Sequence, residues 1–376
     1  MSNSQGATNV EAINLDAIAG APLSPAVIKA WQTAASGAYS DPARMHHAGR
    51  QAGLLLESAR SSIATSLGCN SANVFFAGSA ADAIRVAISG IYRLRSSVSP
   101  RVLVGAVESM AVINAVNNLP GAEIVTIGID PLGRIDLEQL GRELAQGAAL
   151  VCVQVANAEV GTRQPIAEVL GLAREVGVPV VSDATAVITH DPLPTEFDVV
   201  IAPARDWGGP PGIAIMLTSP QLRWRPEEAP DRGWIGGFPD IPAAVAAAVA
   251  LEEASTQQDS AATARALIDQ VRASLDQLPG ITCVGDSVNR LPHILTCIIS
   301  GAAAGELVTA LDKQGIYVAS GSACTADARM PSHVLQAMGL PHESSIRISL
   351  PATCTQNDID KFLTTMPHVL SDVMNS

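Results

Sequence analysis

The sequence predicts an α/β protein in which a large domain with a mostly parallel, seven-stranded sheet precedes a smaller C-terminal α/β domain. Apolar runs alternate with helix-periodic segments from about Asn73 to Met216, which is the pattern of parallel β–α units. The chain has 376 residues, enough for two domains with substantial cores. Hydrophobic residues make up 48% of it and charged residues 16%, a balance that favours cores packed with aliphatic side chains.

The expected elements follow from hydrophobic periodicity. Short apolar runs predict the seven strands of the large sheet at 74–76, 102–104, 124–127, 150–155, 178–181, 199–202 and 212–217. Helical spacing predicts helices at 54–67, 80–94, 111–118, 137–144, 166–176, 241–254 and 261–278. Strands near 281–284, 294–299, 316–319 and 346–350 predict the smaller sheet. The predicted divisions are an N-terminal segment over 1–20, a large domain over 21–255 and a small domain over 256–376.

Charge and composition exclude several classes of function. The net charge of −13, without any basic run, argues against nucleic acid or an anionic membrane as the main partner. The most apolar helix candidate, 241–251, is too short to span a bilayer. The first residues lack the charged and apolar regions of a signal peptide. The six cysteines show neither metal-ligand nor disulfide-framework spacing, so we expect no metal site and a reducing, cytoplasmic location.

One cysteine lies in a segment of unusual composition. Cys324 is surrounded by small and polar residues over 320–327, just before an apolar helical pattern that starts near Pro331. Such a segment is typical of an exposed loop, and access is the first requirement for thiolate chemistry. The alternative is an inert loop thiol, and composition alone does not separate the two.

Five stretches of the chain stand out as motifs, in this order: Leu15-Asp16 with Pro22, His46-His47-Ala48-Gly49-Arg50, Asn157 through Ile166, Ser182-Asp183-Ala184, and Ser320 through Cys324 to Leu335. Together they resemble the motifs of the cysteine desulfurases, which are class V aminotransferases with the type I fold of the pyridoxal-phosphate (PLP) transferases. The resemblance extends over nearly the whole chain. It implies a PLP enzyme in which Cys324 accepts sulfur from substrate cysteine and carries it as a persulfide.

The resemblance also assigns roles to three surviving polar residues. It implies that Asp183 would pair with the pyridine nitrogen, that Asn157 belongs to the cofactor pocket, and that Arg347 binds the substrate carboxylate. Ordinary structural roles remain open at this point. Asp183 can cap a strand end, and Arg347 can pair with an acidic neighbour.

The position of the family's Schiff-base lysine departs from the pattern. That lysine lies in S-x-H-K-x-x-G-P-x-G, and the corresponding stretch of this chain, 203–212, has Asp206 in its place. The chain contains three lysines, Lys29, Lys313 and Lys361, none of them near this stretch in sequence. Because a carboxylate cannot form an imine with an aldehyde, the covalent link to PLP is expected to be lost.

Other cofactor positions are altered as well. By the same resemblance, a phosphate-binding threonine is replaced by Ala80, a ring-stacking histidine by Ser109, a ring-hydroxyl glutamine by Ala186 and a partner-subunit threonine by Phe238. Each lost charge-assisted hydrogen bond costs roughly 1.5–3 kcal/mol, against about 8 kcal/mol for micromolar binding. We therefore expect no bound cofactor, or weak PLP binding without an aldimine.

Four functions are compatible with these residues. The first is a desulfurase-like protein that relays persulfide sulfur through Cys324 or regulates an active desulfurase, as a homodimer or as a heterodimer with that enzyme, with a sulfur-acceptor protein as a further partner. The second is an active PLP-dependent cysteine desulfurase with an atypical pocket. The third is an inert scaffold subunit. The fourth is a different enzyme that uses Asp206, Asp183 and His46 as acid–base groups.

Overall fold

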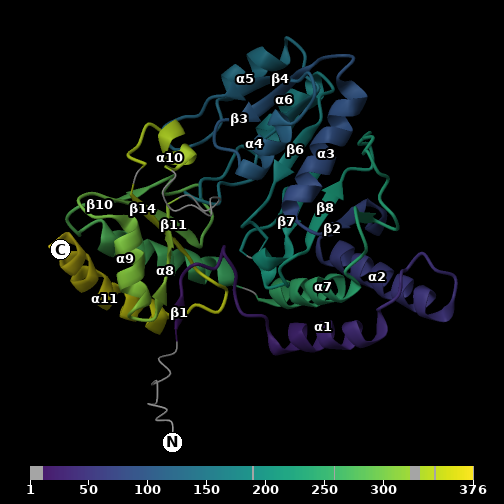
Figure 1. Cartoon of the computed structure of the whole chain (residues 1–376). Helices are drawn as coiled ribbons and strands as arrows, with labels where there is room; N and C mark the ends of the chain where they lie inside the picture. The colour runs from purple at the N-terminus through teal and green to yellow at the C-terminus, as the bar shows by residue number, and fades with distance from the viewer. Residues whose placement is uncertain (1–11, 189, 258, 322–330, 343, 376) are drawn as a thin grey trace, which may run out of the picture.

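An eight-stranded sheet forms the centre of the larger part of the molecule (Figure 1). The computed structural model describes residues 12–188, 190–257, 259–321, 331–342 and 344–375. The strand order is β4-β3-β5-β6-β7-β8-β2-β9, with parallel pairing from β4 to β7 and antiparallel pairing on both sides of β8. The strands are β2 (Val74–Ala77), β3 (Arg101–Gly105), β4 (Glu123–Ile127), β5 (Leu150–Cys152), β6 (Val180–Asp183), β7 (Val199–Pro203), β8 (Ala214–Thr218) and β9 (Trp234–Ile235).

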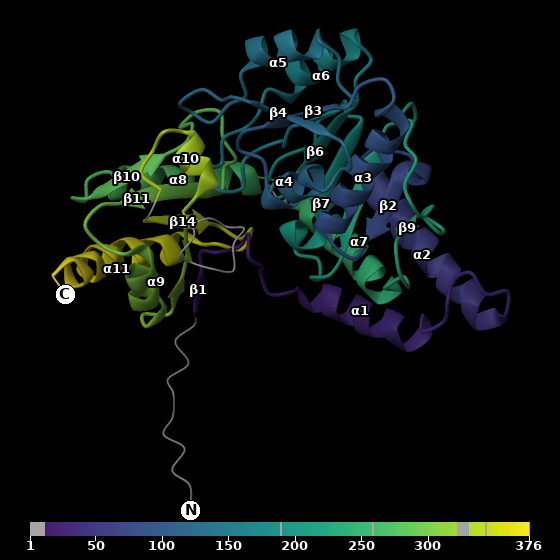
Figure 2. The same ribbon diagram turned by 45° about the horizontal axis from the view of Figure 1, so that its top comes forward.

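Helices cover both faces of this sheet because its strands are apolar on both sides. On β3, Val102 and Val104 belong to the core under α3 and α4, whereas Leu103 belongs to the core on the opposite face. In Figures 1 and 2, α1 runs along the outer side of α7. The helices are α1 (Pro25–Gly37), α2 (His47–Ser66), α3 (Ala80–Arg95), α4 (Met110–Asn117), α5 (Leu137–Leu144), α6 (Ile166–Glu175) and α7 (Ile241–Thr256).

The C-terminal part has its own sheet and core. The strand order is β10-β11-β14-β13, all antiparallel, and α8, α9 and α11 contribute to a core on one side of this sheet. Its elements are α8 (Ser260–Leu275), β10 (Ile281–Val284), β11 (Ile294–Ile299), α9 (Ala304–Asp312), β12 (Ile316–Tyr317), β13 (Ala319–Ser320), α10 (His333–Ala337), β14 (Ser345–Ser349) and α11 (Gln356–Met374). Near the start of the chain, β1 (Ile13–Asn14) pairs in parallel with β12, so the beginning of the described chain packs against its end.

The α/β class is confirmed, and all seven expected strands of the large sheet are present. The sheet has eight strands rather than seven, because Trp234–Ile235 adds β9 beside β2. A two-residue strand in a segment rich in Gly and Pro is too short to show periodicity. The domain limits at 20 and 255 stay a prediction. Within the described parts of the chain, no helix combines the length and apolarity needed to cross a bilayer.

Candidate functional site

Three of the residues singled out from the sequence lie at one edge of the large sheet. Asp183 ends β6, Asn157 follows β5, and Asp206 lies in a short 3₁₀ helix, η2 (Ala204–Trp207), directly after β7. Ser109 caps α4 after β3. The carboxyl ends of parallel strands meet at the same edge, which is where ligands bind in open α/β sheets. The topology therefore places these side chains at the same edge of the large sheet.

Asp183 is buried and bonded to its neighbours on both carboxylate oxygens. The Ser109 hydroxyl donates to Oδ2 at 2.7 Å, and the Thr185 hydroxyl and backbone N–H donate to Oδ1 at 2.6 and 2.9 Å. Ser109 thus bonds the carboxylate that the family resemblance would pair with a pyridine nitrogen. The geometry agrees with the structural role left open for Asp183.

Asn157 is likewise occupied by the backbone. Its Oδ1 accepts from the N–H groups of Glu159 and Val160, both at 2.9 Å, and its Nδ2 donates to the Val107 carbonyl at 3.2 Å. These bonds close the tight turn that follows β5. The side chain holds the loop in shape, which is sufficient reason for a buried asparagine.

Asp206 is buried, and it stabilises a strained backbone position. Its Oδ2 accepts the N–H of Ala186, whose φ of 69° is unusual for a residue with a Cβ. Its Oδ1 has no hydrogen-bond partner within the described residues. Burial raises the pKa of Asp206 to about 7, helped by the charge of Asp183 and opposed by the Ala186 N–H and by Arg205. The neutral and the ionised forms of the Asp206 carboxyl group are therefore both populated near neutral pH.

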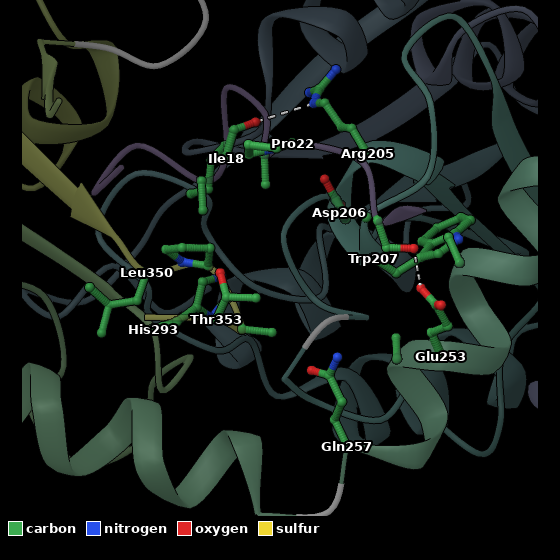
Figure 3. Close-up of a pocket in the computed structure, with 18 of the residues that line it drawn as sticks. Ile18, Pro22, Arg205, Asp206, Trp207, Glu253, Gln257, His293, Leu350 and Thr353 are labelled. Carbon is green, nitrogen blue, oxygen red and sulfur yellow. Dashed lines mark hydrogen bonds between the residues drawn. The ribbon is translucent and has the colours of Figure 1, made fainter. Parts of the chain in front are cut away.

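A cavity of about 250 Å³ lies beside Asp206 (Figure 3). Figure 3 shows Asp206 between Arg205 and Trp207 on one wall, with Glu253 of α7 and His293 among the other residues that line it. The Trp207 indole donates to the Ala247 carbonyl at 2.9 Å and fixes the η2 turn against α7. Burial lowers the pKa of His293 well below its usual range, with the charges of neighbouring basic groups contributing, so this imidazole is neutral. Apolar side chains form most of the remaining wall.

Arg347 on β14 is almost completely buried and paired with an acid. Its Nη2 donates to Asp16 Oδ1 at 2.9 Å, and its Nη1 contacts the Ala158 carbonyl at 3.5 Å. The side chain of Arg347 is 2% exposed and that of Asp16 22%. Asp16 is thus the acidic neighbour that an ordinary structural role of Arg347 requires. Asp16 belongs to the Leu15-Asp16 stretch, so the missing signal was the spatial pairing of two motifs at opposite ends of the chain.

Glu159 is a further buried group that the sequence analysis passed over. It accepts a hydrogen bond from the Ser332 hydroxyl and so joins the turn after β5 to the N-terminus of α10. Burial raises the pKa of Glu159 to about 7, while the Ser332 bond and the charge of Arg347 oppose that rise. His333 follows Ser332 in the chain, and its Nε2 lies 2.9 Å from the Glu108 carbonyl oxygen. Two contacts thus hold the start of α10 at the same edge of the large sheet.

Cys324 itself lies outside the described residues, which stop at Gly321 and resume at Pro331. The residues that flank this segment are each held by a hydrogen bond. The Gly321 N–H donates to the Ser345 carbonyl at 2.8 Å, and Ser332 bonds Glu159. Ser345 begins β14, the strand that carries Arg347, and Glu159 lies in the turn that Asn157 closes.

The pocket does not fit a covalently attached PLP. Asp206 stands at the end of β7 where an amine would be needed, and a carboxylate cannot form the imine. Lys29 lies on α1, Lys313 caps α9 and Lys361 lies on α11, so none is in the wall of the cavity beside Asp206. Within the described residues there is also no cluster of three His, Cys, Asp or Glu side chains placed to hold a metal ion.

Comparisons with known proteins identify the same group of relatives. The class V aminotransferase family model matches residues 13–362. An IscS-like cysteine desulfurase of Mycobacterium tuberculosis is 33% identical, with 94% of this chain and 95% of that protein aligned. The cysteine desulfurase IscS of Methanosarcina thermophila is 25% identical over 98% of this chain and 94% of its own. A solved NifS-like protein superposes with a TM-score of 0.88 at 25% identity, covering 96% of this chain and all of its own.

Proposed function

Since the chain belongs to the class V aminotransferase family, we propose that it is a desulfurase-like protein that carries sulfur on Cys324 without forming an imine to PLP. One observation carries this proposal. Asp206 lies directly after β7, and its Oδ2 accepts a hydrogen bond from the N–H of Ala186, whose backbone is strained. The position therefore has a structural role. Cofactor chemistry is not needed for sulfur to move between thiols.

The neighbouring polar groups support the proposal. Asp183 is bonded to Ser109 and Thr185, and Asn157 is bonded to three backbone groups. A cofactor would have to compete with these bonds, and each buried polar group left without its partner costs about 1–3 kcal/mol. We infer that the polar groups at this edge of the sheet hold the surrounding loops in shape instead of holding a coenzyme.

The relay step follows from thiol chemistry. The Cys324 thiolate attacks the outer sulfur of a donor persulfide, the donor's S–S bond breaks, and the donor leaves as a thiolate. Cys324 then carries the transferred sulfur as its own persulfide and passes it to an acceptor thiol by the same exchange. The transfer is neutral in electrons, and thiolate attack on sulfur is the established route for such exchanges.

Replacing Cys324 with serine tests the relay. We expect the wild-type protein, incubated with an active cysteine desulfurase and cysteine, to acquire a persulfide label that the Cys324→Ser variant lacks. Cys354→Ser is the matched control and should label like the wild type, because Cys354 is a half-buried thiol whose pKa burial raises to about 12. Equal labelling of the Cys324→Ser variant would leave the inert scaffold as the better account.

A reductive trapping experiment tests the absence of the imine. The purified protein is incubated with PLP, treated with borohydride and analysed by intact mass and peptide mapping. With PLP at one equivalent per chain, we expect no stoichiometric pyridoxyl adduct at a single site and no sulfide release from free cysteine, because Asp206 offers no amine in the pocket; scattered labelling of the exposed Lys29 and Lys313 does not count as a site. An active desulfurase of the same family serves as the positive control.

An active cysteine desulfurase with an atypical pocket is the second candidate. It is favoured by the comparisons, since relatives named cysteine desulfurases align over almost the whole chain. A trapped pyridoxyl adduct together with sulfide release would establish this candidate in place of the relay. Its route to an imine would then require one of Lys29, Lys313 or Lys361 from a second subunit or a rearranged chain.

The proposal extends to partners and location. A second copy of the chain or an active desulfurase is the proposed partner, a sulfur-acceptor protein a further one, and the cytoplasm the proposed location. Large apolar side chains exposed on and after α1 and α2 offer a surface for the subunit contact: they are Ile28, Trp31, Tyr39, Met45 and Leu54. Purification from native cells followed by mass spectrometry identifies which partner is bound.

A further inference from the structure

Cys283 and Cys297 face each other directly across the antiparallel pair β10–β11. The hydrogen bond from the Ser300 N–H to the Gly280 carbonyl, at 2.7 Å, fixes which rungs of this ladder are hydrogen-bonded. Hydrogen-bonded rungs recur every second residue, so the rung after Gly280–Ser300 is Thr282–Ile298. The Cys283–Cys297 pair is therefore a non-hydrogen-bonded rung. On such rungs the Cα atoms approach to about 4.5 Å and the side chains are closest. This spacing is within the range that a disulfide bridges without backbone movement.

The two sulfur atoms are already in contact. Their Sγ atoms lie 2.8 Å apart, closer than an ordinary thiol contact. The two side chains share one face of the sheet, because directly opposite residues in an antiparallel pair point the same way. Neither thiol belongs to the edge of the large sheet described above, and no part of the relay through Cys324 uses them.

The two thiols differ in access. Cys283 is half-buried and lies on β10, the edge strand of the small sheet. Cys297 is fully buried among the apolar side chains under that sheet. A reagent from solution therefore meets Cys283 first, and Cys297 can react only with what Cys283 presents to it. A more accessible thiol beside a second, resolving thiol is the arrangement found in oxidisable cysteine pairs.

We propose that Cys283 and Cys297 form an oxidisable dithiol, which a small-molecule disulfide of the glutathione class converts into a cross-strand disulfide. The Cys283 thiolate attacks the reagent's S–S bond, which breaks and releases one small thiol. The Cys297 thiolate then attacks the Cys283 sulfur, releases the second small thiol and completes the bridge. The two cysteines lose two electrons and two protons, and the reagent takes up both. This site does not depend on the proposed function.

The second step needs the thiolate of Cys297, which the surroundings of this residue disfavour. Burial raises the pKa of Cys297 well above its usual range, with contributions from Cys283 and Asp276, while Arg272 opposes that rise. In solution such a thiol would react slowly. Here its target sulfur is held in contact, and well-oriented intramolecular reactions gain effective concentrations of about 10⁵ M or more. Proximity thus offsets the small thiolate fraction.

The bridge would join β10 to β11 at one edge of the small sheet, and β13 lies at the opposite edge. Across this sheet Cys297 pairs with Ile346, and Ile346 pairs with Ser320, the last residue of β13. Closing the ring from Cys283 to Cys297 restricts the unfolded chain and opposes fraying of β10. We therefore expect oxidation to raise the thermal unfolding midpoint of the wild-type protein by several degrees.

The experiment uses the full-length reduced protein treated with oxidised glutathione, blocked with N-ethylmaleimide and digested for mass spectrometry. We expect a peptide containing the Cys283–Cys297 bridge, reversed by dithiothreitol, in the wild type and in Cys354→Ser. Cys297→Ala should instead hold glutathione on Cys283, and Cys283→Ser should form neither product at this site. Circular dichroism confirms that each variant is folded.

Two results would overturn the proposal. One is alkylation of both cysteines in the oxidised wild type. The other is a stable glutathione adduct on Cys283 while Cys297 is present, because the adjacent thiol should then have displaced it.

Discussion

Asp16→Ala is expected to lower the free energy of unfolding by about 3 kcal/mol, one of the two largest effects that we expect of a single substitution. The reason is that Arg347 is 2% exposed and would keep its charge without its carboxylate partner. Removing one member of a buried ion pair typically costs about 3–5 kcal/mol, and the 22% exposure of Asp16 places the effect at the lower end. Urea unfolding followed by circular dichroism measures the change.

Two further variants separate this effect from a general loss of packing. The double variant Asp16→Ala with Arg347→Met removes both charges of the pair, so stability should return to within about 1–2 kcal/mol of the wild type. Glu138→Gln breaks the exposed Glu138–Arg142 contact of 4.0 Å on α5 and should change nothing measurable. If the double variant were as unstable as Asp16→Ala, the uncompensated charge of Arg347 would not be the cause.

The ion pair also constrains what Arg347 can do. A guanidinium has five N–H donors, and here Nη2 is bonded to Asp16, Nη1 contacts a carbonyl and Nε has no partner within the described residues. A ligand carboxylate that needs a pair of parallel donors, as in the substrate-binding role that the family resemblance implies, would compete with Asp16 for the Nη2 side of the fork. That role stays a prediction, and the Asp16 variants are the means to separate it from a structural one.

Hydrophobic pattern predicted most of the fold because long apolar strands carry a strong signal. β3 and β7 are buried on both faces and contain almost unbroken runs of aliphatic residues. By contrast, α1 was not expected, because its exposed face carries Ile28 and Trp31 and its periodicity is weak. β9 was missed for its length. What the pattern could not supply was the pairing of β1 with β12, which depends on long-range packing.

The motifs singled out Asp183, Asn157 and Asp206, but their common position at one edge of the large sheet comes from the structure. The partners of these groups, such as Ser109 for Asp183 and Ala186 for Asp206, are set by loop conformations that leave no periodic trace in sequence. The contact of Cys283 with Cys297 was hidden in the same way, because strand register decides it.

Asp206→Asn is expected to change how stability depends on pH. The pKa of Asp206 is about 7 in the folded chain and 3.8 as an ordinary aspartate, so between these values the folded state binds more protons than the unfolded one. Stability from this group is therefore fully present below about pH 4 and is lost as pH rises through 7. Asparagine has no charge to lose. Relative to the wild type, the variant should gain about 2–4 kcal/mol between pH 4 and 8.

The free energies of unfolding of the wild type and of Asp206→Asn are compared as a difference at each pH, because other buried groups also titrate. Burial raises the pKa of Glu159 to about 7, so this group also lowers stability as the pH rises. Burial lowers the pKa of His190 to about 4, so that group raises stability as the pH rises. Both contributions cancel when the variant is subtracted from the wild type at each pH. Urea unfolding at half-unit steps from pH 5 to 8 gives the two curves, with Glu138→Gln as the exposed-carboxylate control.

Parallel curves for the wild type and Asp206→Asn would mean that Asp206 is ionised in the folded chain throughout this range. A carboxylate charged at pH 5 would need solvent or an ion at Oδ1, which has no partner within the described residues. The cavity beside it would then be a wet, anionic site rather than a mostly apolar one. Curves that diverge between pH 5 and 7 and run parallel above would instead establish a neutral acid that bonds the Ala186 backbone, in the place where a desulfurase requires an amine.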